Sequence, residues 1–180
     1  MKLDSIDYLE AKIRETLSRI PPEDTERLTS SILKAKRIFV FGAGRSGLVG
    51  QMFAVRLVQL GLRVYFVGDM TTPIIGKDDI VILISNTGHT MSVTRTAEIA
   101  KRLGSEVIAV TANRDCKLAR MADCCIFIEP EKDARSGSIA PLGTLFEDSA
   151  LVFFDCLVPD LMKRMNTDES AMRSNHAIWV

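Results

Sequence analysis

Two glycine-containing loops carry most of the side chains that could bind a ligand. The first is Gly-Ala-Gly-Arg-Ser-Gly at residues 42–47, and the second is Ser-Asn-Thr-Gly-His-Thr at residues 85–90. Each follows a short apolar run and precedes a helical pattern. Glycine lets backbone amides turn toward a ligand, and the helix start adds unpaired N–H groups and a partial positive charge. Because a hydrogen bond to a charged acceptor contributes about 1.5–3 kcal/mol, a few such donors hold a phosphate without a lysine.

The hydroxyl groups in these loops have a simpler explanation. The candidate donors are Ser46, Ser85, Thr87 and Thr90. In a single strand–helix turn, such a residue usually caps the following helix. Two such loops in the same sheet, with four hydroxyl side chains between them, favour an anion site over capping alone.

The first loop also matches a dinucleotide-binding pattern. Residues 42–47 fit G-x-G-x-x-G, and Asp69 lies near the position of a ribose-binding acid. A dinucleotide fold also needs a helix between its second and third strands, and the sequence has no helical pattern there. We therefore rank a nicotinamide enzyme below a sugar-phosphate protein.

One carboxylate and two histidines are the candidates for proton transfer. Glu147 lies in the first turns of a long helical pattern, where an acidic residue usually only complements the helix dipole. Beside a ligand crevice, the same carboxylate would be positioned as a general base. His89 lies inside the second loop and His176 follows a short C-terminal helix. Their spacing assigns neither of them a role and is no metal motif.

An alternation of strands and helices must position these residues. Apolar runs predict five strands, at 38–41, 63–67, 79–84, 106–111 and 124–128. Helical patterns occupy 4–19, 22–35, the stretch from the first loop to Gly61, 90–103, 114–122 and 143–165, with a short helix after Asn166-Thr167 whose first turn holds Asp168 and Glu169. This alternation indicates a parallel sheet covered on both faces. We expect residues 68–78 to form an irregular loop, and we expect the ligand crevice at the carboxyl ends of the strands, where the strand order switches.

Composition and charge exclude several classes of protein. The 180 residues include 23 basic and 23 acidic side chains, so the chain lacks the basic surplus of a nucleic-acid binder. Its apolar stretches fall far short of the ~18 residues that suggest a membrane span, and the acidic N-terminus does not fit a signal peptide. The four cysteines have no CxxC spacing, and they fit buried thiols in a reducing cytosol better than a catalytic or metal site. We predict one cytoplasmic domain over residues 1–180, with helices at 1–36, the sheet and its helices at 37–165, and a C-terminal helix and tail at 166–180.

The motifs together resemble one enzyme family. FGAGRSG, TTP, LISNTGHT, PLGTLFED and DESAMRSNHA occur in this order, and the combination is similar to the 6-phospho-3-hexuloisomerase family of single-domain sugar isomerase (SIS) proteins. The resemblance implies an α/β fold: a three-layer α-β-α sandwich with a five-stranded parallel sheet in flavodoxin-like order, preceded by N-terminal helices. It also implies an isomerase (an intramolecular oxidoreductase) that interconverts 3-hexulose 6-phosphate and fructose 6-phosphate in the ribulose monophosphate pathway, in formaldehyde fixation or its reverse.

The same resemblance assigns roles to individual residues. Glu147 matches the catalytic base, and His176 matches a C-terminal histidine that assists it. The residues implied to bind the substrate, mainly its phosphate, are Arg45, Ser46, Ser85, Asn86, Thr87, Gly88, His89 and Thr90. Asn86, Thr87 and His89 depart from the usual family pattern, which bears on substrate preference more than on phosphate binding. The family further implies a homotetramer with sites completed by a neighbouring subunit, and a functional link to 3-hexulose-6-phosphate synthase.

The implied reaction fits the available side chains. A carbonyl moves from C3 to C2 when the C2 proton is removed and an enediol is reprotonated at C3, and one carboxylate can perform both steps. Arg45 supplies charge for an enediolate, and His176 is the candidate for moving the hydroxyl proton. No metal or redox cofactor is needed. The alternatives are a related SIS aldose–ketose isomerase for arabinose 5-phosphate or sedoheptulose 7-phosphate, and a non-catalytic sugar-phosphate sensor.

Overall fold

Five apolar strands form the centre of the molecule. In the computed structural model, which describes residues 4–176, they pair in parallel in the order β2-β1-β3-β4-β5. The strands are β1 (Ile38–Gly42), β2 (Val64–Phe66), β3 (Ile80–Ile84), β4 (Glu106–Thr111) and β5 (Cys124–Phe127). The predicted strands, the parallel sheet and the flavodoxin-like order are all confirmed.

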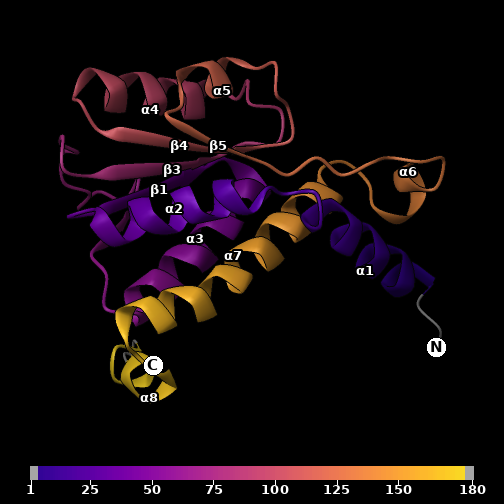
Figure 1. The fold of residues 1–180 in the computed structure, drawn as a ribbon. Helices are drawn as coiled ribbons and strands as arrows, with labels where there is room; N and C mark the ends of the chain where they lie inside the picture. The colour runs from indigo at the N-terminus through magenta and orange to yellow at the C-terminus, as the bar shows by residue number, and fades with distance from the viewer. Residues whose placement is uncertain (1–3, 177–180) are drawn as a thin grey trace.

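Helices cover both faces of this sheet (Figure 1). The helices in residues 4–176 are α1 (Asp4–Leu17), α2 (Pro22–Lys34), α3 (Gly44–Gln59), α4 (Met91–Arg102), α5 (Lys117–Met121), α6 (Ser136–Ile139), α7 (Thr144–Met165) and α8 (Glu169–Ser174), and of these α1, α6 and α8 lie away from the sheet. Alternation along β1 divides the core: Val40 packs in the cluster with α2, α3 and α7, whereas Phe39 packs in the cluster with α4 and α5. Within residues 4–176, no helix has the length and apolar character that crossing a bilayer requires.

The chain between β2 and β3 is irregular, as predicted. Arg37 ties this loop to the sheet, because its Nη2 atom donates to the Ile74 carbonyl (3.0 Å) and to Asp79 Oδ2 (2.6 Å). Burial raises the pKa of the Asp79 carboxyl, but the bonds from Arg37 and from the Gly76 amide outweigh it, so that the pKa is lowered. The described chain has no helix between β2 and β3, where a dinucleotide fold has one.

The structure also departs from the predictions in places. Helix α6 was not predicted, because its four residues are too few to show a helical period. Asp168 lies just before α8, where its side chain accepts a hydrogen bond from the Ala171 amide as an N-cap, and not in the first turn. Cys124 is buried and Cys125 is partly buried. Burial is the main cause that raises the pKa of the Cys125 thiol to about 11. Cys156, in contrast, is exposed on α7.

Candidate functional site

The two glycine-containing loops, here called the anion loops after their predicted role, begin side by side at the carboxyl ends of β1 and β3. Gly42 ends β1 and pairs with Ile84, which ends β3. In the order β2-β1-β3-β4-β5 the direction of strand addition reverses between β1 and β3. Such a switch point is where open α/β sheets bind ligands. The expected position of both loops is therefore confirmed.

Neither loop serves to cap its helix through a side chain. Ala43 precedes α3 and Thr90 precedes α4, and neither makes a side-chain cap hydrogen bond. The Thr90 hydroxyl lies instead 3.0 Å from the Ser85 hydroxyl, and Ser85 Oγ accepts from the Gly88 amide (3.2 Å). Capping thus fails to explain these hydroxyl groups, and they cluster beside the first turn of α4.

The chain after β4 stabilises the second loop through hydrogen bonds to its backbone carbonyls. Three successive loop carbonyls accept hydrogen bonds from this part of the chain: Asn86 from the Ala112 amide (3.0 Å), Thr87 from Asn113 Nδ2 (3.2 Å) and Gly88 from the Leu118 amide (3.2 Å). Gly88 has a φ of +66°, and a Cβ atom there would lie 2.1 Å from Cys116 Sγ. Only glycine fits this position. Asn113 was missed from the sequence, although it lies only two residues after the end of β4, at the same edge.

Glu147 is held by the first loop. Its side chain is largely buried at the start of α7. Arg45 Nε donates to Oε2 at 2.6 Å, and Ser46 Oγ donates to Oε1 at 3.3 Å. On the other side, a Cβ atom on Gly143 would lie 2.9 Å from Oε1, so any side chain at residue 143 would displace the carboxylate. The carboxylate is thus fixed in one orientation next to the anion loops.

Charge is concentrated around Arg45. The hydrogen bond to Glu147 raises the pKa of the Arg45 guanidinium group. Its Nη2 atom also lies 3.4 Å from Asp148 Oδ1. Burial raises the pKa of the Asp148 carboxyl, with Arg45 opposing this shift and Glu147 adding to it. Asp148 was not among the predicted site residues; its place beside Glu147 in the sequence is the signal that could have found it.

A hollow of about 330 Å³ lies at the start of α7, and Glu147 itself is not among its lining residues. Its walls come from the carboxyl ends of β3, β4 and β5 and from the start of α7, and they include Asn86, Thr87, Asn113, Lys132, Gly143 and Phe146. The volume falls at the lower end of the range for small-molecule pockets, about 300–1,000 Å³. The second loop and the residues around Glu147 thus share one cavity.

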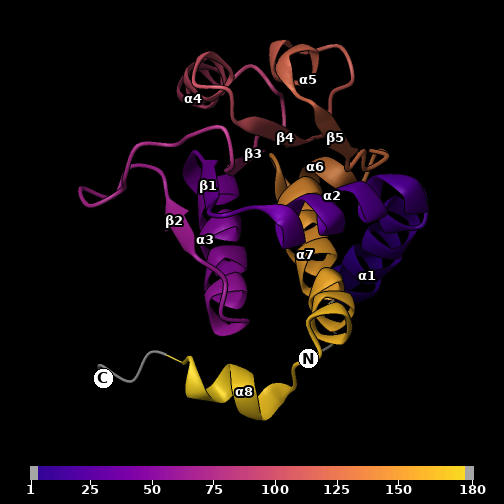
Figure 2. The ribbon, with the colours of Figure 1, turned by 60° about the vertical axis from the view of Figure 1, so that its left-hand side comes forward.

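Both histidines are exposed in this chain, and His176 lies at the opposite end of α3 from Arg45. His89 is exposed, and its backbone amide donates to Thr87 Oγ1 (3.3 Å). His176 is exposed and shares a hollow with Gln59, at the end of α3, whereas Arg45 begins that helix. At 1.5 Å per residue, the two ends of α3 are about 20 Å apart. Figure 2 shows α8, which precedes His176, at the far end of α7 from the sheet.

Comparison with known proteins matches this arrangement to one family. The family model of the SIS domain matches residues 31–147. The chain belongs to the SIS domain family. This SIS domain protein is 43% identical over 152 residues to the 3-hexulose-6-phosphate isomerase of Methanocaldococcus jannaschii, covering 84% of this chain and 81% of that relative. It is 36% identical to the 3-hexulose-6-phosphate isomerase of Bacillus subtilis, with 92% of each chain covered.

A solved structure extends the relationship to the whole fold of the SIS domain protein. A Methanococcus jannaschii protein, whose crystal structure is described as inferring a molecular function of 3-hexulose-6-phosphate isomerase, is 38% identical. The match covers 99% of this chain and 100% of that one, with a TM-score of 0.88. The family relationship predicted from the five motifs is confirmed.

Proposed function

We propose that this protein interconverts 3-hexulose 6-phosphate and fructose 6-phosphate through an enediol intermediate. The observation that carries the proposal is the buried Glu147 carboxylate, which Arg45 and Ser46 hold beside two anion loops. The substrate follows from the relatives in Methanocaldococcus jannaschii and Bacillus subtilis that carry this activity in their names. A sugar phosphate also accounts for the hydroxyl groups of the second loop, which a dinucleotide site does not require.

In the proposed mechanism the loop at 85–90 binds the phosphate and Glu147 moves the proton. Glu147 removes the C2 proton of 3-hexulose 6-phosphate and returns it to C3 of the enediol, while the hydroxyl proton passes from O2 to O3, the transfer proposed for His176. Arg45 lies within hydrogen-bonding distance of that carboxylate, and its charge stabilises the developing enediolate. These steps use side chains alone, without a metal or redox cofactor.

We extend the proposal to a homotetramer in which a neighbouring subunit supplies His176. Within one chain, His176 lies at the opposite end of α3 from Arg45. The outer face of α3 carries an apolar stripe, formed by Leu48, Met52, Val55 and Val58, that is 43–60% exposed. A second copy packed along such a stripe would cover it and bring its own His176 toward this site. The cytosolic location and the functional link to 3-hexulose-6-phosphate synthase belong to the same proposal.

The reaction is tested by following solvent deuterium in fructose 6-phosphate. In D₂O, we expect the protein to exchange the C3 proton, because the enediol to 3-hexulose forms by removal of that proton. ¹H NMR identifies the carbon at which exchange occurs. In parallel, turnover is measured with 3-hexulose 6-phosphate, which is made from formaldehyde and ribulose 5-phosphate. Exchange at C1 would indicate an aldose–ketose isomerase instead. Binding without any exchange would indicate a sensor.

Subunit complementation tests the shared site. We expect the variants Glu147→Gln and His176→Gln to be impaired alone and to recover activity when they are unfolded and refolded together. About a quarter of the sites should be intact, because random pairing makes half of the dimers hybrids and each hybrid has one site with both native residues. Each variant refolded alone is the control. If the mixture stays at the level of the separate variants, His176 does not act across an interface.

A further inference from the structure

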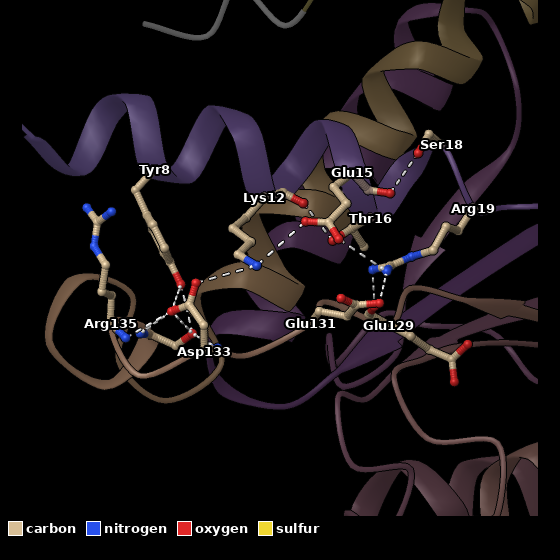
Figure 3. A network of polar contacts seen from close by, with 11 residues as sticks. Tyr8, Lys12, Glu15, Thr16, Ser18, Arg19, Glu129, Glu131, Asp133 and Arg135 are labelled. Carbon is tan, nitrogen blue, oxygen red and sulfur yellow. Dashed lines mark hydrogen bonds and ion pairs between the residues drawn. The ribbon is translucent and has the colours of Figure 1, made fainter.

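Helix α1 is attached to the chain between β5 and α7, here called the 129–143 segment, by a network of polar contacts (Figure 3). The Tyr8 hydroxyl lies 2.9 Å from Asp133 Oδ1 and 2.8 Å from Ser136 Oγ. Lys12 Nζ lies 3.6 Å from Asp133 Oδ2. The hydrogen bond from Tyr8 is the main cause that lowers the pKa of the Asp133 carboxyl. Asp133 is thus the point at which α1 holds the segment.

Two further contacts fix the same segment along its length. Arg19, just after α1, donates to the Glu129 carbonyl (2.9 Å) and pairs with the Glu131 carboxylate. The Tyr8 ring is buried with Ala140 and Leu145 in a small apolar cluster. Leu145 lies two residues before Glu147, so the cluster connects α1 to the first turn of α7. Both ends of the segment are therefore held.

The segment forms a wall of the 330 Å³ hollow. Its residues in the lining are Glu129, Pro130, Lys132, Ala140, Leu142 and Gly143. Leu142 is held at a φ of 57°, a left-handed conformation that non-glycine residues adopt only when their surroundings impose it. The shape of this wall thus depends on what holds the segment, and α1 lies outside the region of the family match, residues 31–147.

The 129–143 segment places one positive charge without an ion-pair partner in residues 4–176 at the hollow. Two of the lining residues are charged, Glu129 and Lys132. The Glu129 carboxylate pairs with Arg114 Nη2 at 2.6 Å. No ion pair or hydrogen bond of the Lys132 ammonium is found in residues 4–176. Lys132 lines the same cavity as Asn86 and Thr87, and it directly precedes Asp133, which α1 holds.

We infer that Lys132 contacts the phosphate of the bound sugar phosphate, and that α1 is a positioning element that holds Lys132 in place through Tyr8 and Asp133. The inference rests on the proposed function, because the phosphate is the only dianion in that substrate. Lys132 then acts directly on binding, and Tyr8 acts through Lys132. Neither residue takes part in proton transfer.

The test is a double-mutant cycle between Lys132 and Tyr8, which do not touch. We expect Lys132→Met to raise KM and the Kd for fructose 6-phosphate about tenfold or more, the effect of losing one charge-assisted hydrogen bond, with kcat within about twofold. Tyr8→Phe, which keeps the ring, should raise both constants several-fold. The double variant should bind fructose 6-phosphate no more weakly than Lys132→Met alone. Tyr8 is proposed to act only by positioning the Lys132 side chain, and in Lys132→Met there is no ammonium group left to position.

Matched variants separate positioning from general stability. Tyr65→Phe removes the hydroxyl of the other tyrosine, whose ring stacks on Phe39 in the sheet, and Lys163→Met removes an exposed charge from the far end of α7. Both should bind as the wild type does. If Tyr8 has a purely structural role, Tyr8→Phe should lower the Tm, and the increases in Kd of the two single variants should multiply in the double variant. That result would overturn the positioning role.

Binding is measured by calorimetry as well as by turnover, so that the two proposals fail in different ways. If the wild type binds fructose 6-phosphate without isomerising it, the proposed function is wrong and the same cycle is read from Kd. If Lys132→Met binds fructose 6-phosphate and inorganic phosphate as tightly as the wild type, the contact with Lys132 is wrong. If the wild type binds neither ligand, both proposals are wrong.

Discussion

Glu147→Gln lowers kcat for 3-hexulose 6-phosphate by about 10³–10⁴-fold, the upper part of the range for a general base, because one carboxylate performs both proton transfers. The amide keeps the shape of the carboxylate and the hydrogen bond to Ser46, but it cannot accept a proton. Binding of fructose 6-phosphate should persist or tighten, since Arg45 loses its charged partner and remains as a cation in the site. Steady-state kinetics and calorimetry on the same preparation measure both effects.

The neighbouring carboxylate provides the matched control. Asp148 follows Glu147 in the chain and also lies near Arg45, at 3.4 Å, but its side chain is 34% exposed, whereas that of Glu147 is 10% exposed. We expect Asp148→Asn to keep kcat within about tenfold and Glu147→Gln to lose deuterium exchange at C3. Near-normal turnover in Glu147→Gln would remove Glu147 as the base. The reverse pattern would transfer the role to Asp148.

The strands and the positions of both glycine-containing loops could be predicted because their signals are local. An apolar run such as Ile80–Ile84 marks a buried strand, and a loop that follows a parallel strand must lie at the carboxyl edge. The strand order came from the resemblance to a known family rather than from the residues. Helix α6 could not be predicted, since Ser136 to Ile139 is a single turn whose start is set by side-chain contacts with Asp133.

The site itself depends on contacts between distant parts of the chain. Arg45 and Glu147 are 102 positions apart, and their ion pair forms only because α3 packs against α7. No motif marks Asn113 or Lys132, which enter the site because the ends of β4 and β5 meet the second loop. The role of His176 also depends on more than local pattern. This residue belongs to a motif that the resemblance joins to Glu147, whereas the fold of one chain separates the two.

The second large effect is expected in the double variant Ser85→Ala/Thr87→Ala, which removes two hydroxyl groups from the anion loop. Each hydrogen bond to a charged acceptor contributes about 1.5–3 kcal/mol, and about 1.4 kcal/mol corresponds to a factor of ten. KM should therefore rise by about 10²-fold or more. The effect on kcat should be smaller, because the phosphate stays bound in the same way while the proton moves. Titration with fructose 6-phosphate and steady-state kinetics give the two constants.

The contacts within the loop decide how this loss is interpreted. Ser85 Oγ also accepts from the Gly88 amide, so Ser85→Ala alone could act by loosening the loop, whereas Thr87 is exposed at its tip. Thr87→Ser keeps the hydroxyl and should restore most of the affinity that Thr87→Ala loses. Thr96→Ala removes a hydroxyl from α4, the helix that follows the loop, where Thr96 donates to the Ser92 carbonyl, and should leave KM and kcat unchanged. If KM is unchanged in the double variant, the phosphate lies elsewhere. If Thr87→Ser fails to restore binding, the threonine methyl group and not its hydroxyl shapes the site.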